Sequence, residues 1–148
     1  MREKKIIGRL EKVNFPDWEI FGLEAKIDTG AYTSSLHCSD IDIVLREGKE
    51  WVRFSILDSS HPYFQNTHLF SPLLKEKKVK SSSGETEHRV FIKSRIYIFG
   101  KSYLTDLSLT NRSEMKYPVL LGRKILRNRF LVDVSKKFLS NQYEGDES

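Results

Sequence analysis

The sequence predicts a mainly β domain, a closed or sandwiched arrangement of short strands with one short helix. Short stretches of alternating apolar and polar residues are separated by turn residues, and only residues 123–128 show a convincing helical turn. The chain has 148 residues, 39% of them hydrophobic, which is enough for one compact core and too little for two full domains. We therefore expect one domain over residues 1–140, followed by a flexible acidic tail over residues 141–148.

The N-terminal part of the chain is expected to form two hairpins. Proline and aspartate supply turn chemistry between the first two strands. The third strand alternates with one slip near Ser39 and Asp40, which indicates a β-bulge, and a turn at residues 47–49 leads into the fourth. The predicted strands are 5–15, 18–28, 34–45 and 51–57.

The remainder of the chain is expected to contain one long loop before strands resume. Residues 58–86 carry repeated turn signals, and a loop of this length in a compact domain is usually functional or mobile. After it, the pattern predicts strands at 89–93, 95–99 and 103–109, a polar loop at 110–117, a short buried strand at 119–121, the helix, and a closing strand at 130–134.

Composition limits the setting in which the protein works. The net charge of +5 suits nucleic acid, an anionic surface or an acidic peptide, but the richest basic stretch, 76–80, has no regularly spaced stacking aromatics beside it. We therefore expect no nucleic-acid partner. The single cysteine, Cys38, excludes an internal disulfide, no apolar run is long enough to span a bilayer, and the N-terminus lacks the features of a secretory signal. These observations favour a cytoplasmic location away from the membrane.

The stretch most suggestive of chemistry is Asp28-Thr29-Gly30. An apolar strand leads to an acid, a small hydroxyl residue and a glycine that frees the backbone to turn, which places one carboxylate at a strand-to-loop corner. The tripeptide alone is a weak signal. It gains weight from the segment Pro-Val-Leu-Leu-Gly-Arg at residues 118–123, because the two together are more specific than either part.

These motifs carry a resemblance to a known family. The matching residues are 26–31, 33–37, 84–89, 111–112, 115, 117–118, 120–123 and 130–133. Over roughly residues 5–140 the chain resembles the retropepsin-like family known as ATP-dependent zinc proteases. The resemblance implies a closed single-lobe acid-protease barrel with one short helix, in which each lobe carries one catalytic aspartate.

The resemblance implies that Asp28 is that catalytic residue. A pepsin-like site needs two carboxylates that share a proton, so a chain with one Asp-Thr-Gly must obtain the second from a twin. We therefore expect a symmetric homodimer, with strands 4–10 and 130–134 at its interface by analogy. The expected active-site support comes from Thr29, Gly30, Ala31, Thr33 and Ser34.

Substrate contacts are expected around the same loop. Arg112 is the preferred partner for a substrate carboxylate, and Gly84, Leu121 and Gly122 complete the expected binding set. A flap is expected within residues 58–88. Because the family is associated with ligases that append glutamate to proteins, the resemblance makes a peptide or protein with an acidic, glutamate-rich tail the expected substrate.

Other chemistries are less well supported by the residues. The four histidines are scattered, and there is no His-Glu-x-x-His helix, no cysteine pair and no phosphate-binding Gly-x-x-x-x-Gly-Lys loop. We expect no metal and no other cofactor. The leading hypothesis is an aspartic peptidase that hydrolyses a peptide or isopeptide-like amide. Its rivals are a catalytically silent peptide-binding module that partners a peptide-ligating enzyme, and a zinc hydrolase.

Overall fold

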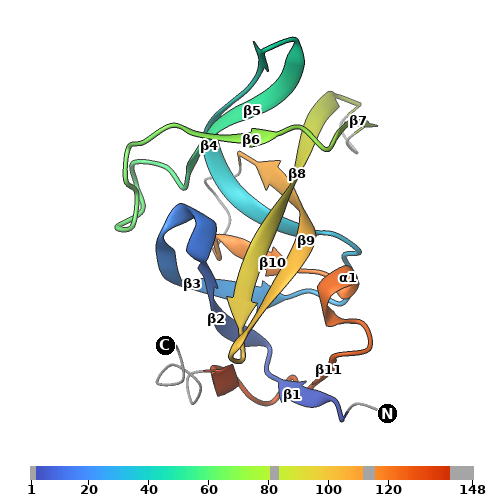
Figure 1. Ribbon diagram of the computed structural model, residues 1–148. Coiled ribbons are helices and arrows are strands. Elements are labelled where there is room, and N and C mark those ends of the chain that lie inside the picture. The colour runs from blue at the N-terminus through green and yellow to red at the C-terminus, as the bar shows by residue number, and fades with distance from the viewer. Residues whose placement is uncertain (1–2, 81–83, 112–115, 141–148) are drawn as a thin grey trace.

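The fold is mainly β, as the sequence predicts (Figure 1). A computed structural model describes residues 3–80, 84–111 and 116–140. Within these ranges the elements are β1 (Lys5–Ile7), β2 (Leu10–Phe15), the 3-10 helix η1 (Pro16–Trp18), β3 (Ile20–Ile27), β4 (Ser34–Arg46), β5 (Lys49–Ile56), β6 (Leu69–Pro72), β7 (Lys75–Lys80), β8 (Thr86–Ile98), β9 (Lys101–Thr110), β10 (Val119–Leu121), α1 (Arg123–Leu126) and β11 (Phe130–Val132). The tail expected at 141–148 lies outside the described residues.

The main sheet closes on itself through β10. Its strands follow the order β10-β3-β2-β8-β9-β4-β5-β6, β7 pairs with β8, and β10 also pairs with β4. The circuit from β10 through β3, β2, β8, β9 and β4 back to β10 is a small barrel. Its closure is uneven, because β2 and β8 meet at a single register pair, Asn14 and Tyr97.

The barrel interior is filled by apolar residues at alternating positions along the strands. Phe15, Leu23, Ile92, Ile96 and Leu107 are almost fully inaccessible and belong to one continuous core. Each contributes about 1.5–3 kcal/mol by leaving water. Figure 1 shows β4, β5 and β6 extending from one end of this barrel, with β1 and β11 at the other.

The first predicted strand, 5–15, is wrong as a single element. The chain breaks at Gly8, and β1 pairs in parallel with β11 in a separate two-stranded sheet. A Cβ at Gly8 would lie 2.5 Å from the carbonyl oxygen of Lys136, so the C-terminal segment packs directly on the break. This contact is tertiary and leaves no trace in the alternation of the first fifteen residues.

The long loop predicted at 58–86 is wrong in part, since it contains β6 and β7. The strand β6 lies at the edge of the main sheet and ends in a proline, and β7 is rich in lysine, both of which are common in edge strands and weaken the strand signal. The predicted bulge is confirmed, because the β4–β5 register shifts between Ser39 and Asp42 and Asp40 has a φ of 52°.

No helix in the described part of the chain is long and apolar enough to cross a membrane.

A buried carboxylate joins the C-terminal segment to the barrel. Glu11 is completely buried, and its carboxylate accepts hydrogen bonds from the backbone N–H of Gly8 at 2.7 Å, the N–H of Ser140 at 2.9 Å and the Ser140 hydroxyl at 2.8 Å. Three donors satisfy a group that would otherwise be costly to bury.

We expect Glu11→Ala to destabilise the protein by about 3 kcal/mol, because three buried donors lose a charged acceptor and a void remains. Urea unfolding at neutral pH measures the change. The control is Glu24→Ala on β3, an exposed glutamate whose removal is expected to cost less than about 0.5 kcal/mol. Equal effects of the two substitutions would contradict an anchoring role for Glu11.

Candidate active site

Asp28 lies at the first position after β3, where the chain leaves the barrel. The backbone N–H of Gly30 donates to Asp28 Oδ1 at 3.0 Å, and the N–H of Ala31 donates to the Asp28 carbonyl at 3.2 Å. The Asp28 side chain is half-buried. One carboxylate oxygen is therefore oriented by the loop's own backbone, at the strand-to-loop corner that the sequence predicts.

The strand β10 holds this loop from below. It pairs in parallel with β3, where Leu121 lies opposite Ile27, and antiparallel with β4, where Leu120 lies opposite Ser35. The N–H of Asp28 donates to the Leu121 carbonyl at 2.9 Å. Two segments that are far apart in the sequence are thus joined at the residue that begins the loop.

Gly122 follows β10 and has no room for a side chain. Its backbone is extended, with φ −95° and ψ 179°, so any residue could adopt the conformation. An added Cβ would lie 2.7 Å from the carbonyl oxygen of Tyr32 and 2.9 Å from that of Ala31. The Gly122 N–H donates to Ser34 Oγ at 3.0 Å. The glycine is therefore required by close packing under the loop of residues 28–33, which we call the Asp28 loop.

The first residues of α1 hold the other side of the loop. The N–H groups of Arg123 and Lys124 donate to the carbonyls of Ala31 and Tyr32 at 2.8 and 2.9 Å, and Arg123 Nη1 donates to the Thr29 carbonyl at 2.9 Å. Every one of these acceptors belongs to the Asp28 loop. The helix is short, and its role here is to satisfy the loop's carbonyls.

Lys124 ties this helix to the barrel. Its Nζ lies 2.5 Å from Asp106 Oδ2 on β9, and the hydrogen bond to Asp106 raises the pKa of Lys124 above its usual value. Asp106 is buried. The ion pair fixes α1 against β9, and through α1 it fixes the loop that carries Asp28.

A cavity of about 420 Å³ opens between the Asp28 loop and the β7–β8 hairpin. Polar groups and two cations surround Asp28 in it, with Phe91 and Leu120 as apolar surfaces. The lining residues are Asp28, Ala31, Tyr32, Thr33, Ser35, Lys77, Arg89, Phe91, Ser108, Thr110 and Leu120. The hairpin overlaps the segment 58–88 in which a flap is expected, and residues 81–83 between its strands lie outside the described ranges.

Lys77 and Arg89 are the charged cavity residues that the sequence did not predict. The other lining residues that were not predicted are Tyr32, Ser35, Phe91, Ser108, Thr110 and Leu120. Lys77 and Arg89 lie directly opposite each other in the β7–β8 ladder, so their side chains emerge on the same face. Lys77 falls within the basic stretch interpreted as a solvated loop or strand edge, and Arg89 within an ordinary strand pattern. A prediction that the lysine-rich stretch 76–80 is a strand paired with the strand that begins near residue 86 would have brought Lys77 and Arg89 together.

The structure distributes the other predicted site residues over distinct environments. Thr33 lines the cavity, Ser34 is buried under the loop, and Thr29 and Gly30 are exposed on it. Leu121 and Gly122 are buried beneath the loop, and it is Leu120 that reaches the cavity. Gly84 is exposed with a φ of 87°. Arg112 lies outside the described residues.

A histidine–aspartate pair contacts the backbone of one of the residues that line the cavity. His37 Nε2 lies 2.6 Å from Asp58 Oδ2, and Nδ1 lies 3.3 Å from the carbonyl oxygen of Thr110, which lines the cavity. Both ring nitrogens face oxygen acceptors, and a protonated imidazole can donate to both. Hydrogen bonds from the Ser60 hydroxyl, His37 and the Ser60 N–H lower the pKa of Asp58 from 3.8 to about 2.

The other candidate metal ligands do not gather. Within residues 3–80, 84–111 and 116–140, no group of three or more His, Cys, Asp or Glu side chains could hold a metal ion. His88 Nδ1 lies 2.7 Å from Glu76, and His68 lies 3.8 Å from Asp40, both on the surface. Cys38 is a buried free thiol, and burial raises its pKa well above the usual value.

The barrel and the Asp-Thr-Gly loop seated on an apolar-apolar-Gly strand define a retropepsin-like domain. The chain belongs to the RimB-like family, whose model is described as retropepsin-like aspartic endopeptidase RimB and matches residues 6–143. A crystal structure of a Legionella pneumophila protein of unknown function superposes with a TM-score of 0.75 at 27% identity, covering 93% of this chain and 99% of the other.

Curated relatives share the domain as part of longer proteins. Proteins named "Probable alpha-L-glutamate ligase" from Shewanella pealeana and Desulfotalea psychrophila are 38% and 33% identical over 97% and 98% of this chain. The chain covers 31% and 33% of those proteins, about a third of their length. The retropepsin-like part of the expected family is thus confirmed, whereas the name ATP-dependent zinc protease is not the one these matches carry.

We expect Gly122→Ala to destabilise the protein by about 2–3 kcal/mol, because its Cβ enters a closed space bounded by two backbone carbonyls. The matched control is Gly22→Ala, where nothing lies within 4 Å of the added carbon and only the left-handed backbone, φ 74°, imposes a cost of about 1 kcal/mol. Denaturant unfolding compares the two. A smaller loss at Gly122 than at Gly22 would contradict the close-packing requirement.

The Asp58 pair makes stability dependent on pH on the acid side. Because the folded-state pKa is lowered from 3.8 to about 2, the contribution is complete above pH 3.8 and is lost as pH falls toward 2. We expect Asp58→Asn to be less stable than wild type at pH 6 and to lose less stability between pH 4 and 2. Unfolding free energies measured across that window would show parallel curves if Asp58 did not contribute.

Proposed function

We propose that this protein is an aspartic-type peptidase that hydrolyses a peptide or isopeptide-like amide with Asp28 as its catalytic carboxylate. The observation that carries the proposal is the seating of the Asp28 loop: β10, Gly122 and α1 hold it on three sides, and the carboxylate borders a cavity large enough for an extended peptide segment. Hydrogen bonds that fix the orientation of a carboxylate in this way are typical of active sites in which the carboxylate must transfer a proton to or from a defined position.

The mechanism requires a second carboxylate, which a twin chain would supply. One Asp28 takes a proton from a bound water while the other, protonated, donates to the substrate carbonyl oxygen. A two-fold axis beside the loop brings the two copies together. The two-stranded sheet of β1 and β11 supports such an interface. Its register partners Ile6 and Leu131 are adjacent apolar side chains that are 44% and 53% exposed.

The cavity favours an acidic substrate. Lys77 and Arg89 project into it from opposite strands of the hairpin, and a substrate carboxylate between them would gain charge-assisted hydrogen bonds from both. The relatives' name is a glutamate ligase, which makes a protein with a glutamate-rich tail the preferred substrate. We place this activity in the cytoplasm, in agreement with a chain that keeps its one cysteine as a free thiol.

A second candidate function is a binding module that holds an acidic peptide for a ligase and does not cleave it. It is favoured by the relatives, in which a similar domain forms about a third of proteins named for ligation. The same cavity and cations would serve it. Turnover of a glutamate-tailed protein distinguishes the two, since the binding module would bind the tail and release it intact.

We expect wild-type protein to cleave a glutamate-tailed substrate and Asp28→Asn to be inactive. A sharper test mixes wild-type and Asp28→Asn chains. When wild type is held constant and an about ninefold excess of Asp28→Asn is added, free exchange leaves about one-tenth of wild-type chains paired with each other, and activity falls accordingly. The control is an equal excess of Asp17→Asn, a chain altered at an exposed position of η1 that keeps Asp28, and with it activity should rise about tenfold in proportion to total chain.

Activity that stays proportional to wild-type concentration despite the Asp28→Asn excess would show that each chain acts alone and would overturn the two-carboxylate mechanism. Loss of activity on treatment with a chelator would instead favour a zinc hydrolase.

A further inference from the structure

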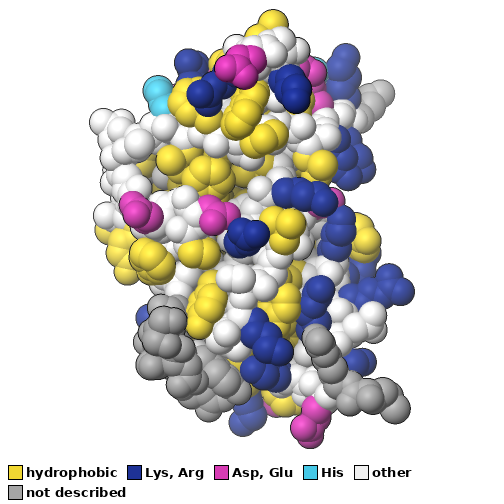
Figure 2. All heavy atoms as spheres, viewed as in Figure 1, with side chains coloured by type: hydrophobic (Ala, Val, Ile, Leu, Met, Phe, Trp, Pro, Cys, Tyr) yellow, Lys and Arg dark blue, Asp and Glu magenta, His cyan; other side chains and the backbone are white. Residues whose placement is uncertain are grey.

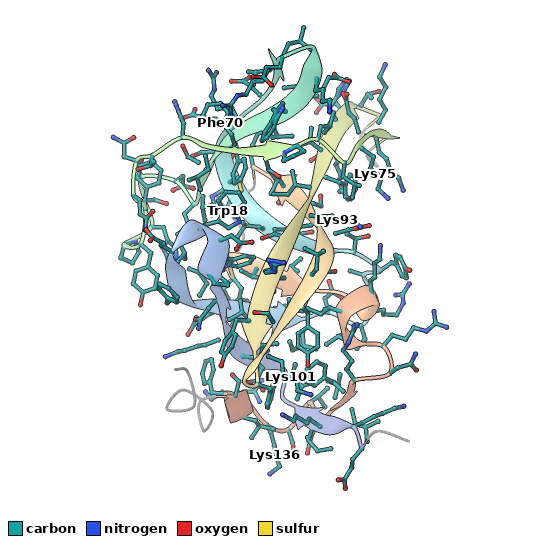
Figure 3. All side chains as sticks on the ribbon, in the orientation of Figure 1. Trp18, Phe70, Lys75, Lys93, Lys101 and Lys136 are labelled. Atoms are coloured by element: carbon teal, nitrogen blue, oxygen red, sulfur yellow. The ribbon has the colours of Figure 1, made fainter. Side chains whose placement is uncertain are left out.

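One face of the β7–β8 hairpin carries a row of cations that continues beyond the cavity. Lys77 lies opposite Arg89 and Lys75 opposite Phe91 in the register. Alternate residues of a strand share a face, so Lys93 and Arg95 continue the row along β8. We call the row formed by Lys75, Lys77, Arg89, Lys93 and Arg95 the basic band. Figure 3 shows Lys75 and Lys93 one below the other along this hairpin.

The two outer cations are available to a partner. Lys93 and Arg95 are exposed, and among the described residues no carboxylate lies within ion-pair distance of either side chain. Asp106, which lies opposite Lys93 in the β8–β9 register, is held by Lys124. In Figure 2, lysine and arginine side chains are spread over this face of the molecule, among hydrophobic and other side chains. The outer end of the band, Lys93 and Arg95, therefore presents positive charge that no carboxylate of the described residues pairs with.

We propose that Lys93 and Arg95 form a second binding site for the acidic chain, outside the Asp28 cavity, so that affinity depends on tail length. The bound chain is the acidic substrate, and to that extent the proposal rests on the proposed function. In this proposal, Lys77 and Arg89 contact the substrate carboxylates nearest to the bond that is cleaved at Asp28. Lys93 and Arg95 contact carboxylates that lie several residues farther along the tail.

The length of the band sets the length of tail that it can bind. Arg95 lies six residue steps beyond Arg89 on β8, a span of about 20 Å at about 3.3 Å per residue. An extended glutamate chain advances by a similar distance per residue, and every second carboxylate lies on the same side. About six further residues are therefore needed to reach from the cavity to Arg95.

An acidic peptide fits the band better than nucleic acid. Binding of single-stranded nucleic acid relies on exposed aromatic rings on which bases stack. The aromatic residue on this row, Phe91, is 6% exposed, and Lys75 Nζ lies 4.9 Å from its ring centroid. The band is also continuous with the cavity that holds Asp28, where the proposed chemistry is the cleavage of an amide.

The test measures binding of fluorescein-labelled, α-linked oligo-glutamates of two to about twelve residues by fluorescence anisotropy. It uses the full chain with Asp28→Asn, which prevents turnover. The band variant adds Lys93→Glu and Arg95→Glu, and the control variant adds Lys49→Glu and Lys136→Glu. The control makes the same charge change at exposed positions on the β4–β5 hairpin and in the C-terminal segment.

We expect affinity to rise with length up to about eight residues and then to level off in the parent and control chains. In the band variant the rise should end at about four residues, so that the dissociation constant for the eight-residue peptide increases at least about tenfold while that for the shortest peptide changes little. Low salt should widen the difference, because exposed charges are screened by ions.

Two results would overturn the proposal. One is the same length dependence in band and control variants. The other is displacement of the peptide by a single-stranded oligonucleotide of equal charge at a lower concentration, with that displacement lost in the band variant. The proposed function is judged separately from wild-type turnover: band-dependent binding without cleavage would support the site and remove the peptidase, whereas cleavage with band-independent binding would do the reverse.

Discussion

The insertion of β10 between β3 and β4 is the constraint on which the rest of the structure depends. This strand closes the barrel, and its last carbonyl accepts the N–H of Asp28. At the next residue, Gly122, the space that a side chain would need is occupied by carbonyl oxygens of the Asp28 loop. A contact between segments so distant in sequence forms late in folding, because the entropy of closing the intervening loop must be offset by contacts already made. The loop that carries Asp28 is therefore ordered only when the whole barrel is complete.

The electrostatics of the hairpin oppose its stability. Lys77 and Arg89 lie directly opposite each other, and like charges in that position repel. Glu87 Oε2 lies 3.9 Å from Arg89 Nη2, too far for a strong hydrogen bond, and the Arg89 Nε is buried without an acceptor among the described residues. Natural proteins tend to keep such locally unfavourable arrangements at functional sites. Among the described residues of the hairpin, Lys77 and Arg89 are accordingly the charged groups that a bound carboxylate would stabilise most directly.

Local chemistry made some of this structure predictable. The Asp28 corner, the Ser39–Asp40 bulge, the short strand β10 and the helix after Gly122 each depend on nearby residues, and the sequence pattern located them. β6 and β7 were missed because proline, serine and lysine are weak strand signals at a sheet edge. The pairing of β1 with β11 depends on packing at Gly8. The cation pair at the cavity depends on the β7–β8 register, which alternation within one strand does not encode.

The buried thiol of Cys38 gives the protein a built-in reporter of its own local opening. It lies on β4, four residues beyond Ser34, whose hydroxyl accepts the Gly122 N–H, and it is paired with Ile56 across the β4–β5 ladder. Complete burial and a raised pKa keep the thiolate scarce, so reaction with an alkylating reagent requires this strand to separate from its neighbours. Because Cys38 is the sole cysteine of the chain, its rate of alkylation reports how often this part of β4 opens, and no cysteine has to be introduced by mutation.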